Sequence, residues 1–328
     1  GLYLIEPELC RHIPNEGSPD FGRDLFPDWV NRFKMYGYNT PEYMKDMGTP
    51  DRLEKVEKDV LAGLPVKKRL SERKVAVFLD RDGVVNDDTE FISTPEQMQV
   101  YPFASEAIKQ LNKSGMLAIL ATNQSVVARN LTTMQGLQKI HHRMETDLGR
   151  DGAYLDAIYF CPHHPDKGFP EENPEFKTEC NCRKPKPGML LEAAGRFNID
   201  LQASFMVGDN ERDLQAGAAA GCTTIGVETG KGLKDGQTQP DLFFPNLLDA
   251  VRFLTSNPWE KALQDIDSAL AKRPSNSLGL VRIGGNTGSG KTTLCTWLAR
   301  HLRLQGKKVL VVRLDDWIVP RKKRKPGE

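Results

Sequence analysis

The chain has 328 residues, of which 27% are charged and 39% hydrophobic, and its formal net charge at pH 7 is +1. This length predicts about two domains. The balanced charge argues against nucleic acid or an anionic membrane as a partner, and no apolar stretch is long enough to cross a bilayer. Six cysteines in a chain of this length do not make a disulfide scaffold, and we see no secretory signal. We therefore expect a cytoplasmic α/β protein.

The first segment, residues 1–68, predicts an apolar strand at Gly1–Ile5, a helix that starts near Phe21, and a helix over Pro50–Leu61. Residues 43–50 read YMKDMGTP. This stretch resembles the carboxyl-terminal part of sugar-phosphate nucleotidyltransferases, and Asp46 takes the position of an Asp that helps to hold magnesium. The alternative is that Asp46 belongs to a turn that caps the following helix. The family's glycine-rich loop is absent from the sequence, so we expect a fragment that does not transfer nucleotides.

An apolar run at Val75–Leu79 ends at Asp80 and Asp82, and Gly83 follows. Such a run predicts a buried parallel strand that ends in a turn. Ligands of open α/β sheets bind beyond the carboxyl ends of the strands. A single Asp there could simply cap a helix, but two at this spacing suggest a nucleophile beside a proton donor.

Three later segments also carry candidate site residues. Two are apolar runs that end in polar side chains, and one is a basic stretch. They are residues 116–124, 183–187 and 205–213. Together with residues 75–85 they resemble motifs I to IV of the haloacid-dehalogenase (HAD) superfamily of phosphotransferases. The resemblance implies that Asp80 is the nucleophile, that Asp82 is the acid and base, and that the Thr122 hydroxyl binds a phosphoryl oxygen. It also implies that Lys184 neutralises the nucleophile and the phosphate, and that Asp209 binds magnesium.

Magnesium prefers one or two carboxylates together with substrate oxygens and water. Asp80, Asp209, the backbone carbonyl of Asp82 and the phosphate meet that preference. The negative charges of the phosphate and these two carboxylates are balanced by Mg²⁺, Arg183 and Lys184. Phosphoryl transfer depends largely on positioning and electrostatic stabilisation, so a nearly neutral site suits this chemistry.

Between the motifs the pattern alternates strand and helix. Apolar residues of segment 137–148 fall on one helical face, so we expect His141 and His142 at the surface. Residues 223–227 predict a further strand. Alternating βαβ units predict a HAD-like parallel sheet with helices on both faces.

A second group of residues predicts a structural zinc site in a polar loop. Cys161 and His163 form a C-x-H pair, and Cys180 and Cys182 form a C-x-C pair. Three thiolates and an imidazole are a usual tetrahedral zinc set, and a metal gives order to a loop with little apolar content. The alternatives are reduced cysteines without a metal and, less favoured, a disulfide. His164 is a spare imidazole, which we expect behind the zinc ligands or on the substrate side rather than as a zinc ligand.

With this zinc set, residues 72–256 resemble the D-glycero-D-manno-heptose-1,7-bisphosphate 7-phosphatase family and its relative, the histidinol-phosphate phosphatases. The chain departs from the family pattern at Val126 and Asn130, where Gly is usual, and at Asn210, where Lys is frequent. Our candidates for substrate contact are Asn123, Arg129 and Arg183. For Asn123 and Arg129 the alternatives are a helix cap or an exposed surface residue.

The last segment, residues 278–328, contains a G-x-x-x-x-G-K-T pattern after a strand-like run at Leu280–Ile283. This is the context of a P-loop, whose amides cradle phosphates. It predicts nucleotide binding, with ATP as the candidate ligand, by Gly285, Gly288, Gly290, Lys291, Thr292 and Thr293. The alternative is an ordinary glycine-rich loop.

A further strand predicted at Lys308–Val312 and an acidic pair at 315–316 make the segment similar to uridine-kinase-like P-loop kinases, with Asp315 as candidate base. The chain stops soon afterwards, so we expect a truncated kinase domain without transfer activity. The basic run at 321–325 is interpreted as a solvated loop. A linker helix at 257–277 would join this segment to the phosphatase.

The sequence therefore predicts a Mg²⁺-dependent phosphatase that acts on a heptose 1,7-bisphosphate through an aspartyl-phosphate intermediate, in the synthesis of nucleotide-activated heptose. A nucleotidyltransferase consumes the sugar 1-phosphate that such an enzyme makes, and this favours the heptose substrate. The alternatives are a histidinol-phosphate phosphatase, an ATP-binding regulatory module and a zinc-stabilised protein without turnover. We expect the missing parts of both flanking domains in a longer natural chain.

Overall fold

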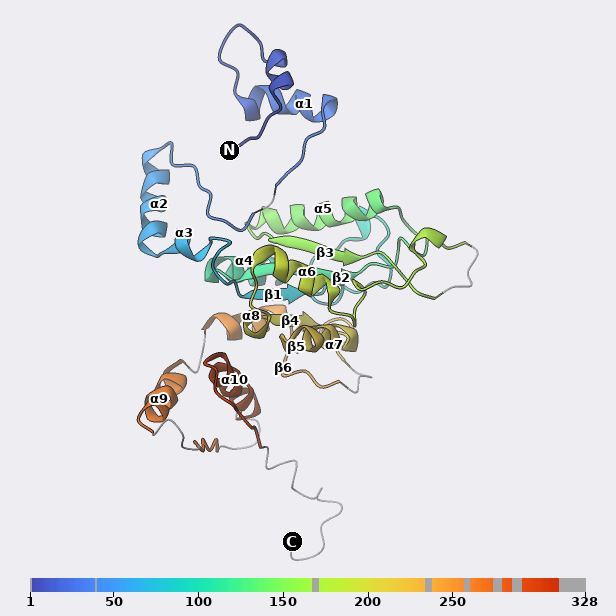
Figure 1. Ribbon diagram of the computed structural model, residues 1–328. Coiled ribbons are helices and arrows are strands. Elements are labelled where there is room, and N and C mark those ends of the chain that lie inside the picture. The colour runs from blue at the N-terminus through green and yellow to red at the C-terminus, as the bar shows by residue number, and fades with distance from the viewer. Residues whose placement is uncertain are drawn as a thin grey trace, which may run out of the picture. The chain divides into compact units, whose positions relative to one another are not determined.

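The structure is a computed structural model that describes residues 2–38, 40–166, 171–233, 238–256, 260–273, 279–284 and 291–312 (Figure 1). The chain divides into two compact units, Gly1–Glu72 and Arg73–Glu328. Among the described residues, no helix combines the length and the apolar character that a membrane crossing requires.

The first unit is helical in its described part. It contains the short helices η1 (Pro7–His12) and η2 (Phe21–Leu25), followed by α1 (Phe26–Arg32), α2 (Pro50–Leu61) and α3 (Leu64–Lys67). Trp29 is 3% exposed and packs among the rings of Phe21, Phe26 and Phe33. The predicted helix at 50–61 has the predicted bounds. The strand predicted at 1–5 is wrong for its described residues 2–5, because this unit offers no described strand with which it could pair.

The second unit is built on a six-stranded parallel sheet in the order β3-β2-β1-β4-β5-β6. The strands are β1 (Ala76–Leu79), β2 (Leu117–Asn123), β3 (Ala157–Cys161), β4 (Phe205–Gly208), β5 (Thr223–Val227) and β6 (Leu242–Phe244). All residues of β1 and β4 are buried, which explains their continuous apolar sequence. The predicted HAD-like parallel sheet is confirmed.

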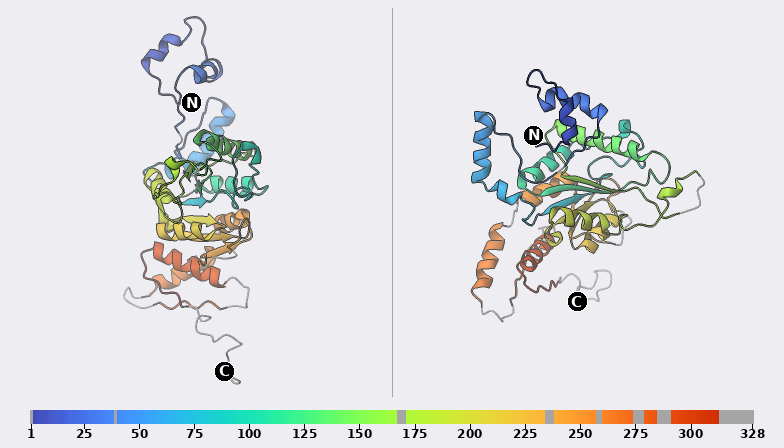
Figure 2. Two further views of the ribbon diagram at one scale, coloured as in Figure 1. Left: turned by 90° about the vertical axis from the view of Figure 1, so that its right-hand side faces the viewer. Right: turned by 45° about the horizontal axis from the view of Figure 1, so that its top comes forward.

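Helices cover both faces of this sheet (Figure 2). One face carries α4 (Ala104–Ser114), α5 (Met134–Arg150) and α8 (Leu247–Ser256), and the other carries α6 (Gly188–Phe197) and α7 (Glu211–Ala220). Three short helices, η3 (Pro95–Gln97), η4 (Pro174–Phe176) and η5 (Leu201–Ala203), lie in the connections.

The strand order reverses between β1 and β4, because the chain builds β2 and β3 on one side of β1 and then returns to build β4, β5 and β6 on the other. Such a reversal leaves a crevice at the carboxyl ends of the two central strands. Leu79 of β1 pairs in register with Val207 of β4. The polar residues that follow these two strands therefore meet at the crevice.

Helix α5 corrects one prediction. Its apolar face is buried as expected, but His141 is also buried, at 4% exposure, and its ring packs against Phe160. The buried face of the helix is wider than the apolar residues alone indicate. Burial lowers the pKa of His141 to about 3, so the imidazole is neutral at physiological pH.

Two helices follow the sheet, α9 (Glu260–Ala271) and α10 (Lys291–Leu304). They share a small apolar cluster around Leu263, Leu298 and Leu302. The strands predicted at 280–283 and 308–312 are wrong, because the described backbone there is irregular and no described strand lies beside it. The basic run at 321–325 lies outside the described residues.

Candidate active site and metal clusters

A pocket of about 330 Å³ opens at the carboxyl ends of β1, β2 and β4. The motif residues singled out in the sequence come together in its walls, and so does the spare imidazole: Asp80, Asp82, Thr122, Asn123, Arg129, His164, Arg183, Lys184 and Asp209. Segments that lie more than 100 residues apart along the chain thus contribute to one cavity.

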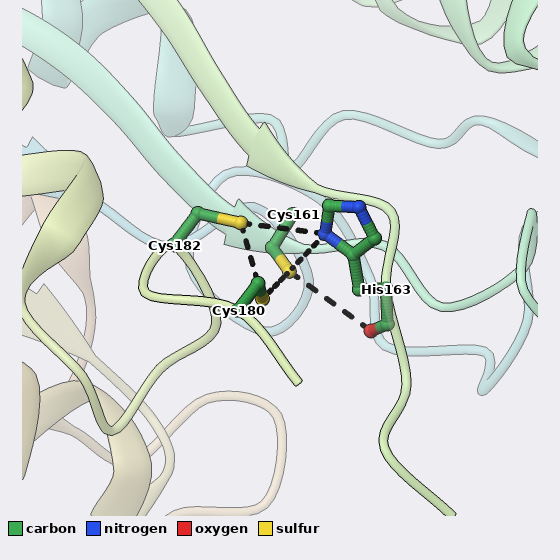
Figure 3. Close-up of side chains that lie close together, drawn as sticks. All are labelled: Cys161, His163, Cys180 and Cys182. Carbon is green, nitrogen blue, oxygen red and sulfur yellow. Dashed lines mark hydrogen bonds between the residues drawn. The ribbon is translucent and has the colours of Figure 1, made fainter. Parts of the chain in front are cut away.

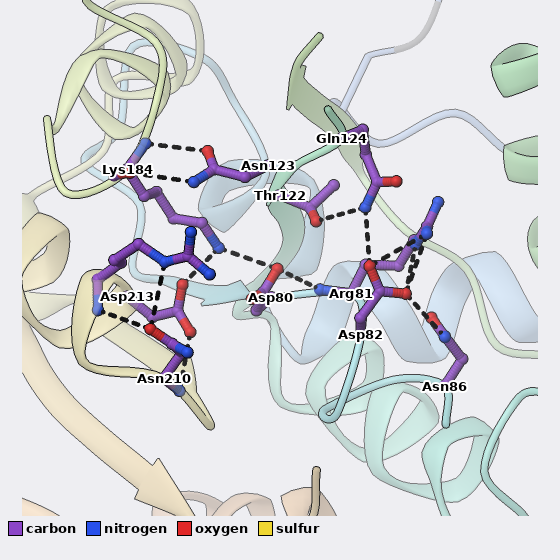
Figure 4. A network of polar contacts seen from close by, with 11 residues as sticks. Asp80, Arg81, Asp82, Asn86, Thr122, Asn123, Gln124, Lys184, Asn210 and Asp213 are labelled. Atoms are coloured by element: carbon purple, nitrogen blue, oxygen red, sulfur yellow. Dashed lines mark hydrogen bonds and ion pairs between the residues drawn. The ribbon is translucent and has the colours of Figure 1, made fainter. Parts of the chain in front are cut away.

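Lys184 lies at the centre of the polar network shown in Figure 4. Its Nζ is 2.9 Å from Asp80 Oδ1 and 2.6 Å from Asp213 Oδ1, and its side chain is 1% exposed. Burial would lower the pKa of Lys184, but the two carboxylates outweigh it and raise that pKa. Lys184 is therefore held as a buried cation.

The two carboxylates that share Lys184 differ in their ionisation. Burial favours the neutral form of Asp80, but Lys184 and the hydrogen bond from the Arg81 amide lower its pKa overall. Burial and the charge of Asp80 raise the pKa of Asp213 to about 7. Asp80 is thus the ionised member of the pair, as a nucleophile must be.

Asp80, Asp209 and Asp213 form a cluster whose ligand atoms lie within 4.8 Å of one another. Burial and repulsion from Asp80 raise the pKa of Asp209 to about 6. Lys184 pairs with Asp80 and Asp213. Among the described residues, Asp209 accepts a hydrogen bond from the backbone amide of Lys231, at 2.7 Å. Buried carboxylates with this excess of negative charge suit a hard divalent cation such as Mg²⁺.

Asp82 is held by three neighbouring side chains. Arg81 donates two hydrogen bonds to its carboxylate, at 3.0 and 3.1 Å, and Asn86 and Gln124 donate one each, at 3.0 and 2.9 Å. These contacts fix the carboxylate beside Asp80. The position is suitable for proton transfer to a group bound at Asp80.

Thr122 and Asn123 end β2 with different roles. The Thr122 hydroxyl accepts a hydrogen bond from Gln124 at 3.0 Å and donates one to Asp80, which helps to lower the pKa of that carboxyl. Asn123 accepts from the backbone amide of Lys184 and donates to its carbonyl, both at 3.0 Å. The side-chain amide of Asn123 thereby positions the Lys184 backbone. Neither the helix cap nor the exposed surface residue considered for Asn123 has this role.

Arg129 and Arg183 face the pocket from two loops. Arg183 donates to the backbone carbonyl of His163 at 3.0 Å. Arg129 lies 3.6 Å from Glu172 and stacks over the ring of Phe91, with 5.0 Å to the centroid. Each guanidinium is held on one side by the protein and lines the pocket.

Cys161, His163, Cys180 and Cys182 converge at the end of β3 (Figure 3). The sulfur–sulfur distances are 3.3 and 3.4 Å, and Nδ1 of His163 lies 3.5 and 3.7 Å from two sulfurs. Ligands about 2.0–2.3 Å from a tetrahedral zinc lie roughly 3.5–3.8 Å apart. The four side chains thus fit a zinc ion, and the cysteines are free thiols rather than disulfides.

Asn130 explains one departure from the family pattern. Its φ is +56°, in the left-handed region where glycine is usual and Asn is the best-tolerated alternative. Its side chain donates to the backbone carbonyl of Glu171 at 3.3 Å. Asn210 caps α7 by accepting from the amide of Arg212, and Val126 is 3% exposed in a small apolar cluster. All three departures are accommodated locally.

No candidate residue of the flanks is among the described residues that line this pocket. Asp46 accepts a hydrogen bond from the Gly48 amide at 3.0 Å and pairs with Arg52 in the first turn of α2, the geometry of the turn-and-cap alternative. Residues 285–290, which include Gly285, Gly288 and Gly290, lie outside the described residues, as does Asp315. Helix α10 begins at the predicted Lys291.

Four residues of the network were not foreseen from the sequence: Arg81, Asn86, Gln124 and Asp213. Each stands inside a motif stretch or directly after one, but its role depends on a partner reached only in the folded chain. Asp213 also forms a capping box with Asn210 at the start of α7. The capping pattern explains Asp213 from the sequence alone and gives no sign of its contact with Lys184.

Comparisons with known proteins agree with the fold and with a phosphatase as the class of enzyme. The family model described as HAD-hyrolase-like matches residues 181–250. A D-glycero-beta-D-manno-heptose-1,7-bisphosphate 7-phosphatase of Yersinia pestis is 41% identical over 176 residues, which are 53% of this chain and 92% of that protein. Its counterpart from Bordetella bronchiseptica is 43% identical over 159 residues, 48% of this chain and 83% of that protein.

A crystal structure of the D,D-heptose 1,7-bisphosphate phosphatase from B. bronchiseptica, complexed with magnesium and phosphate, aligns with a TM-score of 0.50 and 38% identity. It covers 56% of this chain and 99% of that chain. The fold and these similarities define a HAD-like phosphatase, a phosphoric monoester hydrolase. Within that class, the chain belongs to the D-glycero-beta-D-manno-heptose-1,7-bisphosphate 7-phosphatase family. The similarities account for about half of its length.

Proposed function

We propose that this enzyme removes the 7-phosphate of a D-glycero-D-manno-heptose 1,7-bisphosphate, with Mg²⁺ held by Asp80, Asp209 and the backbone carbonyl of Asp82. The observation that carries the proposal is the contact of Asp80 with Lys184 at the strand-order reversal, with Asp82 and Asp209 in the same pocket. The substrate is inferred from these relatives, which are heptose-1,7-bisphosphate 7-phosphatases.

In the proposed reaction Asp80 attacks phosphorus in line, which forms an aspartyl phosphate and breaks the bond to the sugar oxygen. Asp82 gives its proton to that oxygen and then takes a proton from the water that hydrolyses the intermediate. When bound, Mg²⁺ would neutralise charge on the phosphoryl oxygens. Lys184 and the Thr122 hydroxyl add fixed positive charge and a hydrogen bond to the same oxygens.

The remaining pocket residues would hold the sugar phosphate and the loops around it. Arg129 and Arg183 are the proposed substrate contacts, because both are cationic side chains that line the pocket. Zinc at Cys161, His163, Cys180 and Cys182 would be structural, because these four ligands leave no open position. The chain segment from Cys182 to Lys184 then links the zinc cluster to the catalytic lysine.

The test is a phosphate-release panel with heptose 1,7-bisphosphate, other sugar bisphosphates and histidinol phosphate. We expect the highest kcat/KM with the heptose bisphosphate, in the presence of Mg²⁺. The variant Asp80→Asn should lose activity by at least about 10⁴-fold, because the amide is no nucleophile. The variant Arg69→Gln, outside the pocket, is the control.

Two results would count against the proposal. Equal activity of Asp80→Asn and the parent enzyme would exclude Asp80 as the nucleophile. A higher kcat/KM with histidinol phosphate would assign the enzyme to the related amino-acid pathway phosphatases instead.

A further inference from the structure

The turn that follows β5, residues 228–233, contacts the proposed metal ligand Asp209 but contains no residue with a role in the reaction proposed above. The backbone amide of Lys231 donates to Asp209 Oδ2 at 2.7 Å. The amide of Leu233 donates to the backbone carbonyl of Asp209 at 3.1 Å. The turn therefore holds Asp209 at both its side chain and its main chain.

The same turn also contacts the loop that carries Asp82. The hydroxyl of Thr229 donates to the carbonyl of Gly83 at 2.6 Å. The side chain of Lys231 lies 3.6 Å from Asp88, at the rim of the pocket. The turn thus connects the segment after β1 with the segment after β4, on either side of the crevice.

Two glycines allow this close approach. Gly230 has φ +65°, and a Cβ atom at this position would overlap Asp209 Oδ2 and lie 2.6 Å from the Cα atom of Gly83. A Cβ atom on Gly83, which has φ +79°, would also overlap Asp209 Oδ2. One carboxylate oxygen of Asp209 is therefore enclosed by two glycines and a backbone amide. This enclosure fixes the orientation of the carboxylate.

We propose that the turn at 228–233 is a positioning element that orients the Asp209 carboxylate toward the divalent cation. This inference rests on the proposed function, in which Asp209 is a metal ligand. A buried carboxylate that repels Asp80 would otherwise rotate away from it, and the amide of Lys231 opposes that rotation. Groups that orient metal ligands typically contribute about 10- to 100-fold to metal affinity.

The first test compares Gly230→Ala with Gly221→Ala in the full chain. Both glycines have positive φ, +65° and +87°, so both substitutions impose backbone strain. A Cβ atom at 221 meets no described atom within 4 Å, whereas a Cβ atom at 230 displaces Asp209. Binding of Mn²⁺ to protein purified without added magnesium is followed by electron paramagnetic resonance, which needs no turnover.

We expect the Mn²⁺ dissociation constant to rise at least about tenfold in Gly230→Ala and to change less than about twofold in Gly221→Ala. Similar affinity in the two variants would overturn the inference. If Gly230→Ala fails to fold, Thr229→Val replaces it. This variant should weaken Mn²⁺ binding, and Thr229→Ser should restore it because the hydroxyl is kept.

Asp209→Asn separates this inference from the proposed function. Loss of Mn²⁺ binding in Asp209→Asn, with unchanged binding in Gly230→Ala and Thr229→Val, contradicts the role of the turn and leaves the metal site in place. Unchanged binding in Asp209→Asn contradicts the proposed metal site itself, and with it the inference. Weakened binding in all three variants supports both.

Discussion

At the scale of single residues, the pocket holds buried charged side chains that lower the stability of the folded protein. Asp80, Asp209 and Asp213 lie close together in a buried crevice, and Lys184 is the cation paired with two of them. Burial and like charge raise the pKa values of Asp209 and Asp213 to about 6 and about 7. Carboxyls with such perturbed pKa values cluster at functional sites.

The raised pKa of Asp209 leads to a prediction about stability. The folded protein binds this proton up to about pH 6, whereas the unfolded chain releases it near pH 4. The free energy of unfolding of the metal-free protein should therefore fall as the pH rises through this window. Asp209→Asn removes the titration, so this variant should be more stable than the parent at pH 7.5, by on the order of 2–3 kcal/mol.

Urea unfolding of both proteins at pH 4.5 and pH 7.5, without divalent cations, checks this expectation. The difference between variant and parent should shrink at the lower pH. A variant that is less stable than the parent at pH 7.5 would mean that the Asp209 carboxylate stabilises the fold. Asp249→Asn, a substitution on α8, is the matched control for the exchange of a carboxylate for an amide.

Sequence and structure also differ most clearly at this scale. Asp80, Thr122 and Asp209 could be predicted because each follows an apolar run that ends at a sheet edge. The partners of these residues could not be predicted in the same way. Asp213 meets Lys184 only because α7 starts beside the loop before α6, and His141 is buried only because β3 presents Phe160 to α5.

At the scale of elements, the sheet order explains why the motifs meet, and the cysteine–histidine cluster explains how a polar loop is held. The loop between β3 and α6 carries Arg183 and Lys184 directly after Cys182. The apolar runs predicted β1, β2, β4 and β5, which are almost completely buried. They did not predict β3 and β6, whose residues are partly exposed. The same reasoning failed for residues 2–5, 280–283 and 308–312, because an apolar run becomes a strand only beside a pairing neighbour.

The cluster leads to a prediction about this loop. Cys180→Ser should lose zinc and release the loop, which lowers kcat/KM at least about tenfold because Arg183 and Lys184 are no longer held. Zinc content by atomic emission and kinetics with the heptose bisphosphate measure the two effects. Cys10→Ser, at an exposed cysteine in the first unit, is the control and should change neither.

A parent protein that contains no zinc, or a Cys180→Ser variant that retains one zinc per chain, would contradict this prediction. Full activity in a zinc-free Cys180→Ser variant would show that the loop is held without a metal.

At the scale of the whole molecule, the described residues that line the pocket belong to the second unit. The first unit and the helices after the sheet contribute no described residue to the pocket. The P-loop pattern remains a prediction of nucleotide binding. The proposed phosphate release therefore takes place at the crevice between β1 and β4.

The most direct measurement is a rapid acid quench of the enzyme with substrate labelled in the 7-phosphate, followed by peptide mapping. We expect a phosphoryl group on the peptide that contains Asp80. It should be attached and removed at rates that match turnover. Turnover at the same rate with no label on that peptide, or with label on another residue, would contradict this expectation.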